Sequence, residues 1–226
     1  MSIKIKRLTE NFAAEIKDVN LCEKISMRDF SDIKTAFEEY SILVFPNQPL
    51  TDEQQVAFSQ RFGDLENTIN SKQQGGAGKP VTVLTNVGKN GEVIAPEDRR
   101  MVFNTGNQMW HTDSSFKPIP AMMSLLSGRE VPPEGGETEF ASMRAAYEDL
   151  DDDQKSELEQ LICVHDFAYS RSLIDTSLLD REDKYELPPV RQAMIRKNPT
   201  NQRKNLFLGA HASYIEGWSL QKGRML

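Results

Sequence analysis

The chain has 226 residues and a formal net charge of −7, with 38% hydrophobic and 27% charged residues. This is the balance of an ordinary globular protein, and we expect residues 1–226 to form a single domain. The negative charge argues against nucleic acid as a partner. No apolar run approaches the ~20 residues that a membrane span needs, and the amino terminus lacks the apolar core of a signal peptide. We therefore expect a cytoplasmic protein with no membrane partner, whose two cysteines are free thiols.

Two segments near the amino terminus have the periodicity of amphipathic helices. Apolar residues recur at helical spacing from Ser26, a plausible N-cap, as far as Tyr40. The second segment, residues 51–63, opens with Thr51 and has Gln54 three positions later, which is the spacing of a capping box. It ends at a glycine, a common helix stop.

Several short runs have the composition of β-strands. They are rich in apolar or β-branched residues and are bounded by turn-forming residues. In chain order, these runs are residues 3–6, 42–45, 81–87, 121–128, 136–142 and 205–215. The run 42–45 is fully apolar, which is typical of a buried strand, and Asn90 with Gly91 predicts a tight turn.

The remaining segments add two helices and one loop. The pattern of residues 151–167 predicts a helix with Asp151 as its N-cap. Residues 219–226 have the pattern of the first turns of a second helix. The glycine-rich stretch 70–80 lacks the GxxxxGK[ST] pattern of a phosphate-binding loop and is expected to be a loop. A few helices among many short strands favour a mainly β fold, a sandwich or barrel with helices packed against it.

The segment NQMWHTDSSFKP, residues 107–118, places a histidine two positions before an aspartate. Side chains two apart lie on the same face of a strand, so His111 and Asp113 could present an imidazole and a carboxylate to one metal ion. With a second histidine, such a pair forms the 2-His-1-carboxylate triad of non-haem Fe(II) enzymes. The alternative is that Asp113 caps a turn while His111 makes a hydrogen bond in the core. Trp110 is expected to pack in the core.

The sequence around this pair resembles a known family. WHTDSSF, followed by MMSLLSGREVPPEGGETEFASMRAAYEDL, closely resembles the Fe(II)- and 2-oxoglutarate-dependent dioxygenases of the taurine/2,4-dichlorophenoxyacetate family. The resemblance covers nearly the whole chain and includes YSILVFPNQPLTDEQQVAFSQRFGDLE near the amino terminus. GAHASYIEGW is similar to the phenoxyacetate branch. The resemblance implies a double-stranded β-helix, or jelly-roll, core.

The resemblance also implies roles for individual residues. His111 and Asp113 would bind the iron, and the hydroxyl of Thr138 would help to hold a carboxylate of 2-oxoglutarate. Asn107 resembles a substrate-pocket asparagine of the taurine enzymes. His211, in GAHAS, resembles a residue associated with the substrate pocket, where it could polarise or bind a substrate carboxylate.

The third iron ligand is not evident from the sequence. His211 lies far downstream of His111 and is followed by Arg224, an order that would suit a distal ligand and an arginine that clamps 2-oxoglutarate. Its surroundings, however, do not resemble the family's WDNR…HR-like segment. We therefore expect the distal ligand, with the closing strands of the jelly roll, to lie beyond Leu226, so that the chain is a fragment of an active enzyme. His165 is expected to be structural or to support the site.

The resemblance implies a reaction in which 2-oxoglutarate is converted to succinate and CO2 while O2 is used to hydroxylate a small anionic substrate, aryloxyalkanoate- or sulfonate-like. Fe(II) would be the cofactor, and a homo-oligomer is an expectation from the family alone. Two alternatives stay open. One is a non-catalytic member of the family that acts as a binding module. The other is a zinc hydrolase that uses His111, Asp113 and His211.

Overall fold

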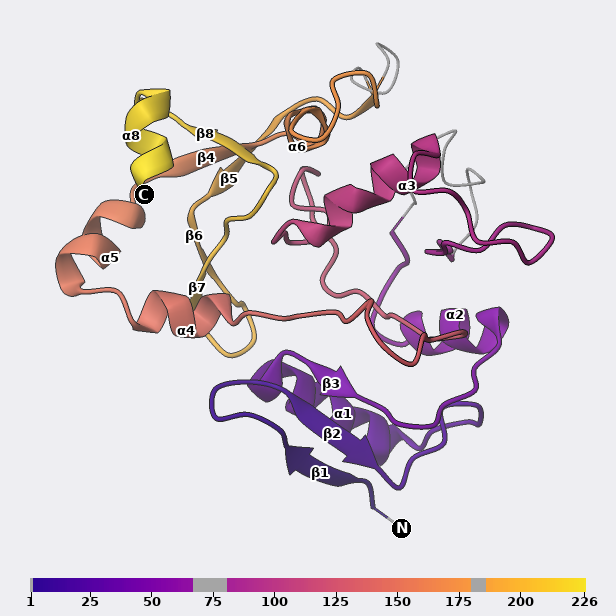
Figure 1. Ribbon diagram of the computed structural model, residues 1–226. Helices are drawn as coiled ribbons and strands as arrows, with labels where there is room; N and C mark the ends of the chain where they lie inside the picture. Colours follow the sequence, from indigo (N-terminus) through magenta and orange to yellow (C-terminus); the bar gives the residue numbers. More distant parts are fainter. Residues whose placement is uncertain (1, 67–80, 180–185) are drawn as a thin grey trace. The chain divides into compact units, whose positions relative to one another are not determined.

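The computed structural model describes residues 2–66, 81–179 and 186–226 (Figure 1). Within these ranges the chain forms two compact units, each of which is described by itself. The first unit contains Met1–Leu65, Leu125–Asp149 and Lys197–Asn205, and the second contains Glu66–Ser124, Leu150–Arg196 and Leu206–Leu226. The expected loop at residues 70–80 lies outside the described residues, and the single domain stays a prediction.

The first unit packs a helix against a three-stranded sheet. Its elements are β1 (Lys4–Arg7), β2 (Ala14–Lys17), α1 (Met27–Tyr40), β3 (Leu43–Val44), α2 (Asp52–Ser59) and α4 (Met143–Glu148). The central strand, β2, is antiparallel to β1 and parallel to β3. Its fully buried Ile16 joins a core cluster with Phe30 and Ile33 of α1 and Phe58 of α2.

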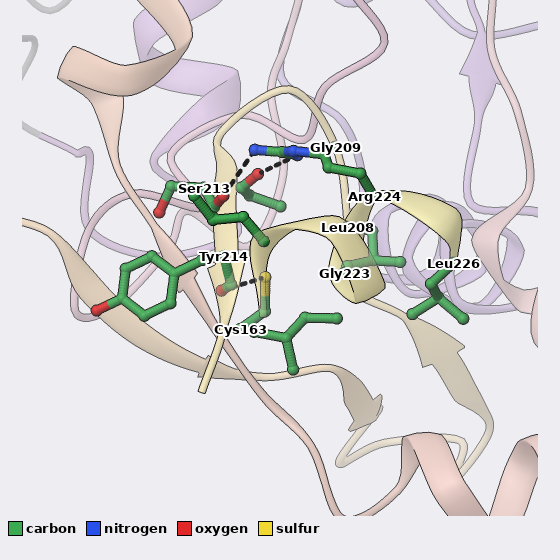
Figure 2. Close-up of a pocket in the computed structure, with 11 residues that line it drawn as sticks. Cys163, Leu208, Gly209, Ser213, Tyr214, Gly223, Arg224 and Leu226 are labelled. Atoms are coloured by element: carbon green, nitrogen blue, oxygen red, sulfur yellow. Dashed lines mark hydrogen bonds between the residues drawn. The ribbon is translucent and has the colours of Figure 1, made fainter. Parts of the chain in front are cut away.

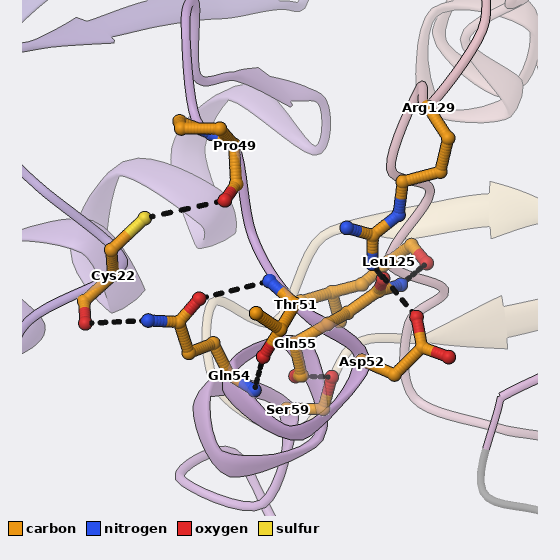
Figure 3. Close-up of polar contacts among 9 residues, drawn as sticks. All are labelled: Cys22, Pro49, Thr51, Asp52, Gln54, Gln55, Ser59, Leu125 and Arg129. Carbon is orange, nitrogen blue, oxygen red and sulfur yellow. Dashed lines mark hydrogen bonds and ion pairs between the residues drawn. The ribbon is translucent and has the colours of Figure 1, made fainter.

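The helix starts of the first unit follow the sequence closely. The Ser26 side chain accepts a hydrogen bond from the backbone of α1, and Thr51 and Gln54 form the predicted reciprocal capping box at the start of α2 (Figure 3). The expected strand 42–45 is shorter than predicted and is not buried, because Val44 is 42% exposed. Pro46, which has no amide hydrogen to donate, follows at once and limits this strand.

Side-chain hydrogen bonds attach the later segments of this unit to its helices. In α2, Gln55 donates to the carbonyl of Leu125 at 3.1 Å, and Arg129 pairs with Asp52 at 3.0 Å (Figure 3). Arg144 of α4 donates to two backbone carbonyls at the carboxyl-terminal end of α1. These last carbonyls have no partner within the helix itself, so the buried guanidinium caps α1.

The second unit is built on a three-stranded antiparallel sheet in the order β5-β4-β8. Its elements are α3 (Arg99–Asn104), the 3-10 helix η1 (Thr105–Gln108), α5 (Asp152–Leu158), β4 (Ile162–His165), α6 (Phe167–Ser172), β5 (Val190–Ala193), β8 (Ala212–Ile215) and α8 (Leu220–Met225). Two strands outside this sheet, β6 (Ile195–Lys197) and β7 (Lys204–Leu206), pair with each other, and each includes residues assigned to both units.

Three strand predictions were wrong. The runs 81–87, 121–128 and 136–142 form no strand in the described structure. Near the first of them there is an isolated bridge between Val87 and Val93, which flanks the predicted turn at Asn90 and Gly91. Many apolar side chains of these runs are exposed. Strand propensity reflects packing against neighbouring strands as much as the residues themselves, and these runs lack such neighbours among the described residues.

The prediction of one long helix over residues 151–167 was also wrong about the length of the helix. Asp151 caps α5 as predicted, but α5 ends at Leu158, and the β-branched and buried residues that follow form β4. The strand expected over 205–215 is split into β7 and β8. The helix at the last residues, α8, is confirmed and begins after Ser219.

The fold prediction is confirmed at its coarser level, since helices and small sheets occur together in the described residues. Both cysteines are free thiols, Cys163 buried and Cys22 partly exposed. Among the helices of the described residues, none is both long enough and apolar enough to cross a membrane.

Candidate metal centre

The histidine and aspartate of the HTD segment face each other. His111 Nε2 lies 3.3 Å from Asp113 Oδ1. The two residues lie in an irregular segment after η1, so the strand expected here was wrong. Two ligands at right angles around a metal ion, each ~2.1 Å from it, lie about 3.0 Å apart. The pair therefore fits two adjacent coordination positions of one ion.

Hydrogen bonds to the outer atoms of both side chains fix this orientation. His111 Nδ1 lies 2.7 Å from the carbonyl oxygen of Met109, to which it donates. Ser124 Oγ donates to Asp113 Oδ2 at 2.6 Å. The other carboxylate oxygen, Oδ1, is the one that faces His111. Such outer contacts set the tautomer and the ring orientation of metal-binding histidines. These contacts therefore fix the orientation of one nitrogen of His111 and one oxygen of Asp113 toward each other.

The two side chains also shift each other's protonation. The side-chain hydrogen bond from His111 lowers the pKa of Asp113, while the hydrogen bond to Asp113 raises the pKa of His111 against the effect of burial. The carboxylate is thus charged at neutral pH. A metal ion that binds here takes the place of a proton shared between the pair.

The loop 209–211 lies against the backbone of the HTD segment. Ala210 N donates to the carbonyl of Trp110 at 2.8 Å. A Cβ atom on Gly209 would lie 3.0 Å from His111 Cα, tighter than nine in ten real Cβ contacts, and the φ of Gly209 is +156°, so this close approach favours glycine. Trp110 itself is 59% exposed, and the prediction that it packs in the core was wrong.

The turn that follows Asp113 is anchored to β5. Gln192 is buried in that strand, and its Nε2 donates to the carbonyls of Ser115 at 3.1 Å and Lys117 at 2.9 Å. Ser115 is itself buried, so its backbone oxygen depends on a protein partner. One side chain therefore connects the turn after His111 and Asp113 to the central sheet of the unit.

His211 is buried beside the pair. Its ring centroid lies 6.1 Å from that of His111, 4.8 Å from Phe116 and 5.9 Å from Phe167. The Ser170 hydroxyl donates to the Phe167 carbonyl, so His211 Nδ1 must donate to Ser170 Oγ, 2.9 Å away. Burial lowers the pKa of His211 to about 3, and the ring is neutral. It therefore offers an acceptor at Nε2 rather than a donor for a carboxylate.

The other expected site residues are more dispersed. In the described ranges, no group of three His, Cys, Asp or Glu side chains is arranged to hold a metal ion, so His211 does not complete a triad there. Asn107 is exposed on η1, and Thr138 is exposed in an irregular segment of the first unit. The roles expected for Asn107, Thr138 and His211 stay predictions.

His165 is fully buried in β4, and neither ring nitrogen makes a hydrogen bond of normal geometry. Its ring stacks on Phe207 with a centroid distance of 5.3 Å. Burial lowers the pKa of His165 to about 4, which outweighs an opposing backbone contribution from Phe207. A neutral, packed imidazole agrees with the structural role predicted for it.

A separate cavity of about 180 Å³ lies between β8 and α8 (Figure 2). Arg224 lines it and donates to the Ser213 carbonyl at 2.7 Å and to the Tyr169 hydroxyl. Burial raises the pKa of Cys163, on the same cavity, to about 11, so this thiol is unreactive at neutral pH. Arg224 is thus occupied by backbone and phenol oxygens of its own unit.

Three residues near the centre were missed in the sequence: Ser124, Gln192 and Arg171, whose guanidinium lies 4.9 Å from the Phe167 ring and donates to the Phe103 carbonyl at 3.1 Å. Ser124 gave one signal, because it interrupts the apolar run MMSLLSG. Gln192 and Arg171 gave none, since they bind backbone carbonyls that are distant in sequence.

Comparison with known proteins identifies the family. Residues 4–226 match the family described as "Taurine catabolism dioxygenase TauD, TfdA family". The chain belongs to this family. It is 39% identical to the alpha-ketoglutarate-dependent 2,4-dichlorophenoxyacetate dioxygenase of Cupriavidus pinatubonensis, over all of this chain and 80% of that protein. It is 34% identical to the (S)-phenoxypropionate/alpha-ketoglutarate-dioxygenase of Sphingobium herbicidovorans, over 94% of this chain and 72% of that protein.

Similar solved structures support the same family assignment. The crystal structure of AAD-2 in complex with Mn(II) and N-oxalylglycine has a TM-score of 0.88 and 41% identity to this TauD/TfdA family member, over all of this chain and 78% of that chain. A putative alpha-ketoglutarate-dependent 2,4-D dioxygenase from Burkholderia xenovorans has a TM-score of 0.77 and 29% identity, covering 99% of this chain and 76% of its own. The family resemblance in the sequence is therefore confirmed.

Proposed function

We propose that the protein is an Fe(II)- and 2-oxoglutarate-dependent dioxygenase that hydroxylates a small anionic substrate, and that His111 and Asp113 hold the metal. The observation that carries this proposal is the 3.3 Å approach of His111 Nε2 to Asp113 Oδ1. Family membership supports it, as do relatives named for 2,4-dichlorophenoxyacetate and (S)-phenoxypropionate. More distant relatives are named alkylsulfatase and sulfate ester dioxygenase, which supports an acidic substrate. The family also supports a jelly-roll core.

Each residue of the centre has a defined task in this proposal. Fe(II) with 2-oxoglutarate supplies the activation of O2, leaving succinate and CO2 beside the hydroxylated substrate. The Met109 carbonyl keeps the proton of His111 on Nδ1, so that Nε2 is free for the metal. Ser124 holds one oxygen of Asp113 and directs the other toward the same point. The hydroxyl of Thr138 would bind a carboxylate of 2-oxoglutarate.

Aromatic residues pack beside the imidazole of the pair, while the Asp113 side chain is 58% exposed. Phe116, Phe167 and His211 are all buried, and their rings contact one another next to His111. An apolar wall on the His111 side lowers the local dielectric there and would strengthen electrostatic interactions at a bound metal ion.

The test is succinate release from 2-oxoglutarate with Fe(II) and a substrate panel of aryloxyalkanoates, alkyl sulfates and alkylsulfonates. We expect release that depends on one substrate class and is lost in His111→Ala and Asp113→Ala. Gln160→Ala, an exposed change in the same unit, is the control and should keep full activity.

Other outcomes identify the alternatives. Substrate binding without succinate release would indicate a non-catalytic member of the family. Activity with Zn(II) and no need for 2-oxoglutarate would indicate a hydrolase. Full activity in His111→Ala would refute the assignment of the metal centre.

A further inference from the structure

A groove of about 650 Å³ lies in the first unit, between the loop that precedes α1 and one face of α2. Residues 21–27 form one wall. The other wall consists of Gln54, Ala57 and Phe58 of α2 and Arg61 in the turn that follows, at the spacing of a single helical face. A volume of this size is typical of ligand-binding pockets, which range over about 300–1,000 Å³.

Side-chain hydrogen bonds connect the two walls of the groove. Gln54 Nε2 donates to the Cys22 carbonyl at 3.0 Å (Figure 3). Two helical turns further along, Arg61 Nη1 donates to the Ile25 carbonyl at 3.2 Å, and its guanidinium lies 3.9 Å from the centroid of the Phe30 ring. The loop is thus attached to α2 at both ends of the groove. A groove that is already formed limits the entropy cost of binding a ligand.

The buried part of the lining is apolar. Leu21, Ile25 and Phe58 belong to the core cluster of the unit. Two apolar residues of the lining face solvent: Met27, which is 81% exposed, and the small Ala57. Methionine is flexible and adapts to ligands of irregular shape. An apolar ligand that covers these side chains would remove them from water, which favours binding.

The charged part of the lining is mainly basic. Lys24 is exposed and Arg61 is half-buried, and within the described ranges neither forms an ion pair. The one carboxylate of the lining, Glu23, accepts a hydrogen bond from the Asn20 amide at 2.8 Å. The bond to Ile25 leaves further N–H donors of Arg61 for a ligand. An anionic head group is therefore complementary to this groove, although the whole chain has a net charge of −7.

We propose that the groove is a binding site for a free amphipathic anion, an aliphatic chain that ends in a carboxylate. The chain lies against the apolar lining, and its carboxylate is attracted by Lys24 and Arg61. This site is additional to the proposed function, because its residues all belong to the first unit, whereas His111 and Asp113 belong to the second.

Cys22 allows occupation of the groove to be measured directly. It lines the groove and is half-buried, whereas Cys163 is buried and burial raises its pKa to about 11. N-ethylmaleimide should therefore modify Cys22 and spare Cys163, which peptide mass spectrometry resolves. We expect octanoate, at about ten times its Kd, to slow the modification of Cys22 about tenfold by mass action. Acetate, which lacks the chain, and 1-octanol, which lacks the charge, should have little effect at the same concentration.

Variants of the lining test the site by calorimetry with octanoate. Lys24→Met should weaken binding at least about fivefold. Lys34→Met, at an exposed lysine of α1 outside the groove, is the matched control and should bind octanoate like the unaltered protein. Ala57→Leu fills the groove and should abolish binding, whereas Gln60→Leu, exposed and outside the lining, should leave it unchanged. Leucine is favourable in helices, and Lys24→Met decides the point if Ala57→Leu melts at a lower temperature.

Four results would each overturn the proposal. Equal protection by octanoate and 1-octanol would show that the groove does not select charge. Unchanged octanoate binding in both Lys24→Met and Ala57→Leu would place the ligand elsewhere. A modification rate of Cys22 that falls as the protein concentration rises would indicate that a second copy covers the groove. Protection by phosphatidylglycerol vesicles but not by octanoate would indicate a membrane surface.

His111→Ala distinguishes this proposal from the proposed function. Octanoate should protect Cys22 in this variant as it does in the unaltered protein, even where succinate release is lost. Loss of that protection in His111→Ala would place octanoate at the candidate metal centre and overturn the proposal, while the proposed function would stand.

Discussion

His111 Nε2 and Asp113 Oδ1 lie 3.3 Å apart although no strand carries the two residues. Their approach depends on contacts from outside the HTD segment: the Met109 carbonyl at the imidazole, the Ser124 hydroxyl at the carboxylate and the Gly209 backbone behind the chain. The geometry of the candidate metal centre therefore depends on neighbours that hold an irregular segment in place.

Ser124 should tune metal affinity without supporting the fold. Ser124→Ala frees Asp113 Oδ2, and removal of such an outer contact typically lowers metal affinity by 10- to 100-fold. Mn(II) titration followed by electron paramagnetic resonance would measure the loss. Ser124→Thr keeps the hydroxyl and should bind Mn(II) nearly as well as the unaltered protein. Unchanged affinity in Ser124→Ala would show that Asp113 is oriented by other groups.

Gly209→Ala should disturb the candidate metal centre through the backbone of His111 and Thr112, against which Gly209 lies. The added Cβ would meet His111 Cα at 3.0 Å and two backbone atoms at 3.3 Å, so the HTD segment must shift. We expect a weaker Mn(II) affinity together with a loss of stability of about 1–3 kcal/mol, as for overpacked sites. Gly223→Ala, whose Cβ would have ordinary contacts at 3.8 Å, is the control and should be neutral. Normal Mn(II) binding in Gly209→Ala would contradict this account of the loop.

Gln192→Ala should destabilise the second unit. It removes the hydrogen bonds to the Ser115 and Lys117 carbonyls, and each buried polar group left unsatisfied costs about 1–3 kcal/mol. Urea unfolding at neutral pH measures the change, with the exposed Gln160→Ala as the control. An unfolding free energy equal to that of the control would mean that water replaces the glutamine amide.

Because His165 is buried and neutral, we expect the free energy of unfolding to fall in acid. Burial lowers its pKa in the folded state to about 4, against 6.5 in the unfolded chain. Between these values only the unfolded chain binds the proton, so the stabilisation is complete above pH 6.5 and is lost as the pH falls toward 4. The slope is up to about 1.4 kcal/mol per pH unit. The positive charge of Arg196, above the Phe207 ring against which His165 stacks, acts in the same direction.

The variant His165→Leu isolates this effect. Urea unfolding between pH 4 and 7.5 should give a flatter profile for the variant, with an equal or higher free energy of unfolding at pH 5. A profile that keeps the slope of the unaltered protein would assign the acid sensitivity to other groups.

The sequence allowed the local features to be predicted, because their determinants are local. Ser26, Thr51 and Asp151 each cap the helix that they were expected to cap, since an N-cap needs only the first turn that follows. The runs 81–87 and 121–128 failed as strands, because a strand depends on partners elsewhere in the chain. Val44 shows the same limit, since its exposure is decided by what packs on it.

The candidate site shows the same division. The HxD spacing and the family resemblance identified His111 and Asp113, whereas Gln192 and Arg171 were not found, because their backbone partners lie more than 60 residues away in sequence (77 for Gln192 with Ser115 and 68 for Arg171 with Phe103). Trp110 was misassigned to the core because its place in the sequence, next to His111, gives no indication of whether the indole faces solvent.

The most direct measurement of the central claim is Mn(II) affinity in the presence of N-oxalylglycine, compared among the unaltered protein, His111→Ala, Asp113→Ala and His165→Leu. The account predicts one bound Mn(II) per chain in the unaltered protein and in His165→Leu, and a loss of at least about a hundredfold, or ~2.7 kcal/mol, in the two other variants. Equal Mn(II) affinity in all four proteins would contradict it.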